Sequence, residues 1–178
     1  EPPLALRAHR KGDLPSAIEG YRRVLEGGER VDARMNLGSA LAAAGRAREA
    51  RGALAMAASL APDDARLQRD VGIGLASIGC AAESRAPLER AARLDPSLSG
   101  ASLFLVRALL EAGDREGAVR EARRAVLLAP ETAALHLELH RALFDDRDPS
   151  AAIEAAERAV ALDPTWELAR LQWGAALA

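Results

Sequence analysis

The stretch AAIEAAERAVALDP, residues 151–164, carries the pattern that decides the fold. It ends in a proline, with a leucine two residues earlier and an alanine five residues earlier. The same three residue types recur upstream in register, 34 residues apart, at prolines 62, 96, 130 and 164, leucines 60, 94, 128 and 162, and alanines 57, 91, 125 and 159. Chance does not keep three columns in register over four copies, so we read the chain as a repeat array.

The first copy follows the same pattern with a shift of one residue. Gly12 and Tyr21, for example, match Gly45 and Leu54 at a spacing of 33. We therefore predict a single repeat domain over residues 1–178, whose units are residues 1–30, 31–64, 65–98, 99–132 and 133–166, followed by a terminal helix at 167–178.

Each copy is expected to contain two helices joined by a tight turn. In residues 67–78 the apolar positions recur at spacings of three and four, which predicts a helix, and Gly79 breaks it. Residues 81–94 form the second helix of that copy. In the last copy we expect Asp148 to cap a helix whose first residue is Pro149. We find no strand-like alternation of apolar and polar residues.

With its period of 34, the chain resembles the tetratricopeptide repeat family, and MNLGSAL at 35–41 and AAIEAAERAVALDP match the motif of that family. The resemblance covers nearly the whole chain. It implies an all-α, right-handed superhelical solenoid of antiparallel helix pairs, in which the first helices line a concave groove. The chain departs from the motif at Val106 and His140, where other copies have glycine, which bears on how tightly the helices of those copies pack.

Composition argues against several classes of function. The net charge is −2, so we expect no nucleic-acid partner. No segment approaches the roughly 18 apolar residues of a membrane span, and no signal peptide is visible, so we expect no membrane insertion and a cytoplasmic protein. A periplasmic or membrane-anchored place in a longer parent chain stays open. Because the chain opens at Glu1 without methionine, we expect a piece of a longer protein or a processed product.

The residues that suggest catalytic or metal chemistry do not form a convincing site. His136 and His140 are four apart and share a helix face, but Glu138 points about 160° away from His136 and no third ligand lies nearby. Cys80 is the only cysteine and has no histidine or base near it in sequence. We therefore expect no metal, no cofactor and no catalytic activity, and two histidines packed between helices.

The candidate partner site lies on the opposite side of the first helices. If the recurrent leucines and both histidines form the packing side, the other side faces the groove, and in the last two full copies it carries apolar residues among charges. Such a surface is typical of a partner site. The predicted groove residues are Arg69, Leu103, Phe104, Arg107, Leu110, Leu137, Glu138, Arg141, Phe144 and Leu171. Alternatively, the curvature of the array or a terminal helix covers the leucines.

Three functions follow from this interpretation. The first is a protein–protein interaction module that binds an extended or helical peptide in its concave groove. The second is an N-terminal docking domain of a larger enzyme, because residues 5–26 resemble the opening repeat of bacterial arrays fused to glycosyltransferases, methyltransferases or sulfotransferases. The third is a self-assembling scaffold that forms homo-oligomers through its terminal helix.

Overall fold

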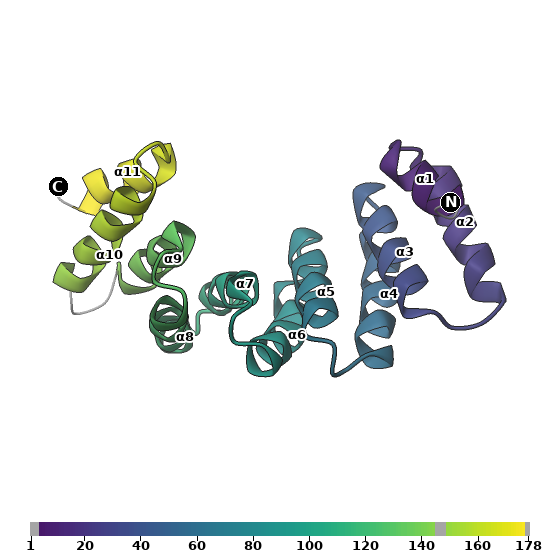
Figure 1. Ribbon diagram of the computed structural model, residues 1–178, viewed down its shortest axis with the longest axis horizontal. Helices are drawn as coiled ribbons and strands as arrows, with labels where there is room; N and C mark the ends of the chain where they lie inside the picture. The colour runs from purple at the N-terminus through teal and green to yellow at the C-terminus, as the bar shows by residue number, and fades with distance from the viewer. Residues whose placement is uncertain (1–3, 145–148, 177–178) are drawn as a thin grey trace. The chain divides into compact units, whose positions relative to one another are not determined.

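The computed structural model describes residues 4–144 and 149–176, and these are helices and short connections without a strand (Figure 1). The chain divides into two compact units, residues 1–94 and 95–178, and each is described by itself. The first unit contains α1 (Leu4–Arg10), α2 (Leu14–Glu26), α3 (Val31–Ala43), α4 (Ala47–Leu60), α5 (Ala65–Ser77) and α6 (Ala81–Leu94). The second contains α7 (Ser99–Glu111), α8 (Arg115–Leu128), α9 (Ala133–Leu143), α10 (Pro149–Leu162) and α11 (Glu167–Ala176).

These helices confirm the predicted sequence of helix pairs and a terminal helix. The predicted second helix at 81–94 matches α6 at both ends, and Pro149 is the first residue of α10. The expected cap Asp148 lies outside the described residues. Whether the two units form the single repeat domain that we predicted stays a prediction.

A glycine in the left-handed conformation closes the turn within each of the first four pairs. At Gly79 the backbone φ is 78°, a value that costs glycine little and other residues much. The next amide, that of Cys80, donates a hydrogen bond of 2.9 Å to the carbonyl of Leu75, which is the usual way to satisfy the end of a helix. The recurrent glycines of the sequence therefore set the sharp reversal between the two helices of a pair.

The two helices of a pair approach closely because one of them has a smaller residue where the helices cross. In the first unit, a Cβ added to Gly72 would lie 2.5 Å from Cγ of the fully buried Leu88. In the second unit the equivalent positions hold Val106 and Ala122, both fully buried. The bulk has moved from the second helix to the first, so the loss of glycine in the fourth copy does not open the core.

His140 and Ala156 continue this exchange in the fifth copy, and both are fully buried. The core as a whole is rich in alanine, with leucines placed between the alanines.

Within each unit, the first helix of a pair contacts the second helix of the preceding pair, and first helices also contact each other, α3 with α5 and α7 with α9. Among the described helices no comparable contact joins the second helices, so grooves remain between them. No described helix is long and apolar enough to cross a membrane.

Candidate partner-binding surface on the first helices

The predicted site residues fall into both units. Arg69 lies on α5 of the first unit, where it forms an ion pair of 2.7 Å with its neighbour Asp70. The other nine residues belong to the second unit, on α7, α9 and α11 or at the end of α9. The candidate site is therefore the set of these residues in the second unit.

Four predicted residues lie on α7, and all four are half-buried: Leu103, Phe104, Arg107 and Leu110. The guanidinium carbon of Arg107 lies 5.4 Å from the centre of the Phe104 ring, within the range of a cation–π contact. This contact holds the arginine close to apolar surface while part of its side chain stays in water.

Two predicted residues do not face solvent, and the expectation that they do is wrong. The side chain of Leu137 is only 1% exposed, because it packs with Ala159 of α10 and Ala169 of α11. This part of α9 is thus covered both by its own partner α10 and by α11. Glu138 is also 1% exposed, which is unusual for a carboxylate unless it is paired.

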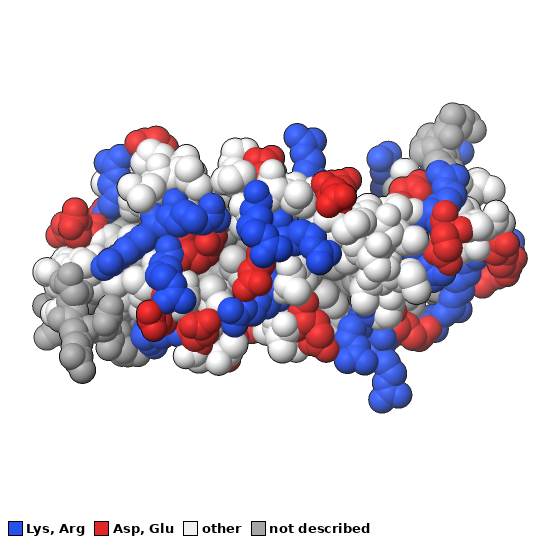
Figure 2. Space-filling model, turned by 90° about the horizontal axis from the view of Figure 1, so that it is seen from below, with Lys and Arg blue, Asp and Glu red and all other residues white. Residues whose placement is uncertain are grey.

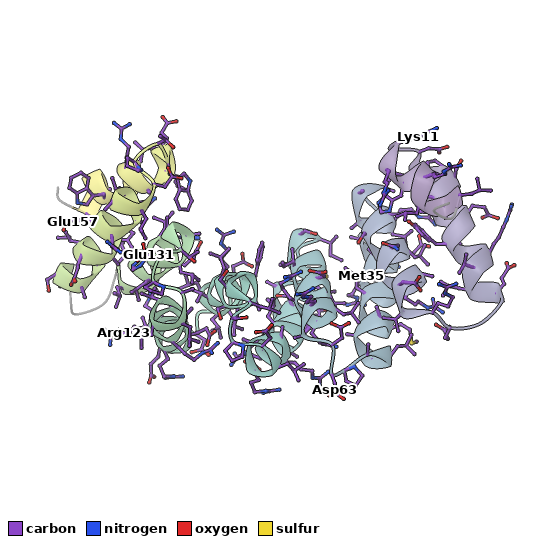
Figure 3. The ribbon with its side chains drawn as sticks, viewed as in Figure 1. Lys11, Met35, Asp63, Arg123, Glu131 and Glu157 are labelled. Carbon is purple, nitrogen blue, oxygen red and sulfur yellow. The ribbon has the colours of Figure 1, made fainter. Side chains whose placement is uncertain are left out.

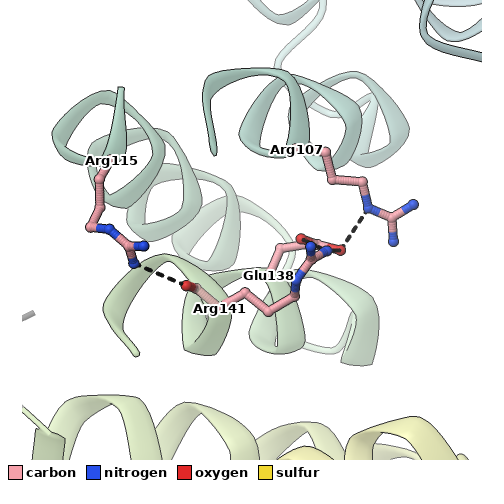
Figure 4. A network of polar contacts seen from close by, with 4 residues as sticks. All are labelled: Arg107, Arg115, Glu138 and Arg141. Carbon is pink, nitrogen blue, oxygen red and sulfur yellow. Dashed lines mark hydrogen bonds and ion pairs between the residues drawn. The ribbon is translucent and has the colours of Figure 1, made fainter. Parts of the chain in front are cut away.

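Glu138 is paired with two arginines (Figure 4). Its Oε1 accepts a hydrogen bond of 2.7 Å from Nε of Arg107, and its Oε2 accepts one of 2.9 Å from Nη1 of Arg141. The arginine side chains are 38% and 47% exposed. One buried carboxylate therefore holds two partly exposed guanidiniums in fixed positions, which leaves one excess positive charge at the surface.

A third arginine supports the end of the same helix. Arg115, at the start of α8, donates hydrogen bonds of 3.4 and 3.2 Å to the carbonyls of Arg141 and Ala142 (Figure 4). Carbonyls at a helix C-terminus lack partners within the helix and attract a cation. The sequence analysis missed Arg115, because nothing in its local pattern relates it to a helix 26 residues further along the chain.

Exposed apolar side chains lie at the same helix end and on α11. Phe144 follows α9 and is 50% exposed, while one edge of its ring contacts His140, with the ring centres 5.5 Å apart. On α11, Leu168 and Leu171 are 49% and 64% exposed. Together with the guanidiniums of Arg107 and Arg141, these groups can hold a segment that carries both apolar and acidic side chains.

The histidine pair is structural. His136 is 8% exposed and His140 is fully buried. The Nε2–H of His136 donates to the carbonyl of Pro130 at 2.8 Å, and the Nδ1–H of His140 donates to that of Ala152 at 3.0 Å. In the described part of the chain, no three His, Cys, Asp or Glu side chains are grouped so that they can hold a metal ion.

Elsewhere on the surface, charges largely compensate one another locally. Figure 2 shows arginines and carboxylates interleaved over one face of the molecule. Many of them pair one helical turn apart, such as Arg85 with Glu89 at 2.7 Å and Arg120 with Glu116 at 2.6 Å. Arg22 and Arg46 also share one carboxylate, that of Glu49, but it is 46% exposed. The group of Arg107, Glu138 and Arg141 differs because its shared carboxylate is buried.

Comparison with known proteins gives a consistent result. The family model described as tetratricopeptide repeat matches residues 3–65 and 103–165. Among solved structures, the chain is similar to YrrB, described as a TPR protein with an unusual peptide-binding site, with a TM-score of 0.78, 18% identity, and coverage of 94% of this chain and 87% of that one.

Two further similar structures come from named bacteria. A fragment of MamA from Desulfovibrio magneticus RS-1 gives a TM-score of 0.78 and 20% identity, covering 92% of this chain and 93% of that one. A thermophilic TPR protein from Thermus thermophilus, TTC0263, gives 0.65 and 16%, covering 98% and 95%. No curated protein sequence matches the chain. The predicted all-α solenoid of helix pairs is confirmed by these similarities.

Proposed function

Because the chain belongs to the tetratricopeptide repeat family, whose members are protein-interaction scaffolds, we propose that it binds a peptide segment of a partner protein on the first helices of its second unit. The segment carries an acidic side chain close to aromatic or aliphatic ones. Its carboxylate meets the guanidiniums of Arg107 and Arg141, and its apolar side chains cover Phe104 and Phe144.

The observation that carries this proposal is the buried carboxylate of Glu138. Ordering two arginine side chains on binding normally costs conformational entropy. Here that cost is met in part before binding, because Glu138 already fixes both guanidiniums. The peptide-binding site described for the similar protein YrrB makes a peptide a reasonable kind of ligand for this fold.

Self-assembly is a second candidate, and a specific observation favours it. Leu171 is 64% exposed on α11, whereas Leu137, one repeat earlier, is 1% exposed beneath α10 and α11. A second copy of the chain that covers α11 would bury Leu171 in the same way. Light scattering over a concentration series tests this, and a mass that stays monomeric at every concentration excludes it. A docking domain for a glycosyltransferase, methyltransferase or sulfotransferase stays an alternative without a structural observation of its own.

The proposal is tested by neutralising the charged group without leaving a buried charge unpaired. Replacing only the two arginines would lower the free energy of unfolding by about 3 kcal/mol, because the carboxylate of Glu138 would stay buried without a partner. The informative variant is therefore Arg107→Gln with Glu138→Gln and Arg141→Gln. Its affinity for a fluorescent peptide that contains glutamates and leucines should fall by about tenfold.

The matched control is Glu138→Gln alone. This change keeps both arginines but no longer fixes them, so the affinity should fall less than in the triple variant, which has lost both guanidiniums. Circular dichroism and thermal melting establish that both variants are folded. If the triple variant binds the peptide as tightly as the wild type, the surface is assigned wrongly.

A further inference from the structure

Within each unit, grooves run between second helices. In the first unit, grooves of about 490 and 410 Å³ lie between α2 and α4 and between α4 and α6. In the second unit, a groove of about 580 Å³ lies between α8 and α10. Equivalent repeat positions line all three, so the grooves can be compared residue by residue.

Both grooves of the first unit are crossed by an ion pair. Arg22 of α2 binds Glu49 of α4 at 2.8 Å, and Arg51 of α4 binds Glu83 of α6 at 3.1 Å. Each pair joins the two helices that form the walls. All four residues line the grooves, so a segment bound along either groove would meet its ion pair.

The α8–α10 groove lacks this ion pair. Two repeats after Arg51 and Glu83, the chain has Val119 and Ala151, which cannot form it. A further difference appears at Leu127, which is 82% exposed and stands two repeats after Ser59, a residue that lines the α4–α6 groove. At these positions the groove of the second unit is thus not crossed by an ion pair; the pair of Arg158 with Glu131, at 3.0 Å, joins α10 to the segment that follows α8. Leu127 follows the lining residue Val126 and adds an exposed leucine.

The walls of the α8–α10 groove carry charges of opposite sign. Arg123 lies on α8, and Glu154 and Glu157 lie on α10; Figure 3 labels Arg123 and Glu157. These three side chains are exposed, and no hydrogen bond or ion pair within the described part of the chain engages them. Arg158 of α10 also lines the groove, but its charge is compensated by Glu131 at 3.0 Å. Between these walls, the floor is formed by α9 and includes Leu139 and Leu143, with His136 beside them.

We propose that the α8–α10 groove binds an amphipathic helix of a partner protein. Leucine-like side chains of that helix lie on the floor and against Leu127, basic residues flank them along α10, and acidic residues flank them along α8. A helix fits because side chains at spacings of three and four give an apolar stripe with a charged edge on either side. Ridges of such a helix can pack between two neighbouring helices.

This site is distinct from the surface around Glu138, since it lies between the second helices and shares no residue with that surface. One unit would then hold two segments at once, one on its first helices and one between its second helices. Such an arrangement lets the protein bring two partners together, which is what a scaffold does.

The test uses two synthetic helical peptides of about 15 residues, each with a leucine stripe. The mixed peptide has lysines along one edge of the stripe and glutamates along the other, and the acidic peptide has glutamates along both. Both peptides carry glutamates and leucines that the surface around Glu138 would also bind, so fluorescence anisotropy is measured on the full chain carrying Arg107→Gln, Glu138→Gln and Arg141→Gln. The mixed peptide should bind about fivefold more tightly or better. In the variant Glu154→Lys with Glu157→Lys both walls are basic, so the preference should reverse in favour of the acidic peptide.

A second variant places an ion pair across the α8–α10 groove, like the ion pairs that cross the grooves of the first unit. Val119→Arg with Ala151→Glu introduces the missing ion pair, and binding of the mixed peptide should fall about tenfold while the helical signal in circular dichroism is unchanged. Val119→Gln with Ala151→Gln is the matched uncharged control, and it should bind more tightly than the closed variant.

Saturable binding of the mixed peptide by this chain, whose surface around Glu138 is neutralised, separates the groove from the surface proposed on the first helices. The proposal is overturned if neither peptide binds this chain saturably up to about 1 mM, if this chain does not distinguish the peptides, or if adding Glu154→Lys with Glu157→Lys leaves the preference as it was.

Discussion

At the scale of single residues, Glu138 shows how one buried carboxylate determines the character of a surface. On its own, a carboxylate that is 1% exposed would be strongly unfavourable, and two arginines from different helices make it tolerable. The same contacts fix the arginines at the surface with one positive charge in excess. Glu138, which a partner cannot reach, thus holds Arg107 and Arg141 in the positions where a partner can bind them.

Glu49 offers a residue-scale prediction about pH. Hydrogen bonding from Arg46, with a contribution from Arg22, holds the pKa of this carboxyl below its usual value of 4.5. As the pH falls, Glu49 therefore takes up its proton at a lower pH in the folded state than in the unfolded state. The stability that Glu49 contributes is present above about pH 4.5 and is lost as the pH falls through the lower folded value.

We expect Glu49→Gln to flatten the fall of the unfolding free energy between about pH 5 and pH 3, compared with the wild type. Urea unfolding at a series of pH values measures this. Glu157→Gln is the control, since no ion pair or hydrogen bond in the described chain engages Glu157, and it should leave the slope nearly unchanged. Equal slopes for the wild type and Glu49→Gln would contradict the assignment.

At the scale of helices, the exchange of bulk between the two members of a pair explains how the repeats tolerate loss of their glycine. Gly72 faces Leu88 in the third copy, while Val106 and Ala122 occupy the same positions in the fourth. The pair behaves as a unit of fixed volume, so a change on one helix is accepted when the other helix compensates.

This account predicts that mutations at the two positions are coupled. Ala122→Leu alone should overpack the α7–α8 crossing and cost about 1–3 kcal/mol, and Val106→Gly alone should leave a cavity and cost about 2–3 kcal/mol. The double variant restores the arrangement of the third copy, so its loss of stability should be smaller than the sum by about 1–3 kcal/mol.

Chemical denaturation of the four proteins in the cycle measures the coupling. As a mismatched control, Val106→Gly is combined with Ala57→Leu in the first unit, for which the two losses should simply add. If the losses of unfolding free energy for Val106→Gly and Ala122→Leu were also additive, the two positions would not compensate for each other.

At the scale of the whole chain, the repeat period made most of the fold predictable. Because proline, leucine and glycine recur in register, the number of helix pairs and the bounds of α6 follow from the sequence. The site was harder to predict, since a helical wheel gives the direction of a side chain but not what lies opposite. Leu137 points away from the histidines as expected, and yet α10 and α11 cover it.

The ion pairs that cross the first two grooves were equally hidden from the sequence analysis. Arg51 and Glu83 are 32 residues apart and belong to different repeats, so no local pattern connects them. Their absence from the α8–α10 groove becomes visible only when equivalent positions are compared in three dimensions. Interactions between repeats are thus the part of the site that the periodicity alone did not indicate.

The central claim is that a partner peptide lies on the first helices of the second unit, with its acidic group at Arg107 and Arg141. The most direct measurement is an NMR titration of the full chain with the peptide of glutamates and leucines, following the arginine Nε–H signals and the backbone amides. We predict that the signals of Arg107 and Arg141 and the amide of Phe144 shift together and saturate at one peptide per chain. Saturable shifts confined to other helices, or no shifts at these residues, would contradict the account.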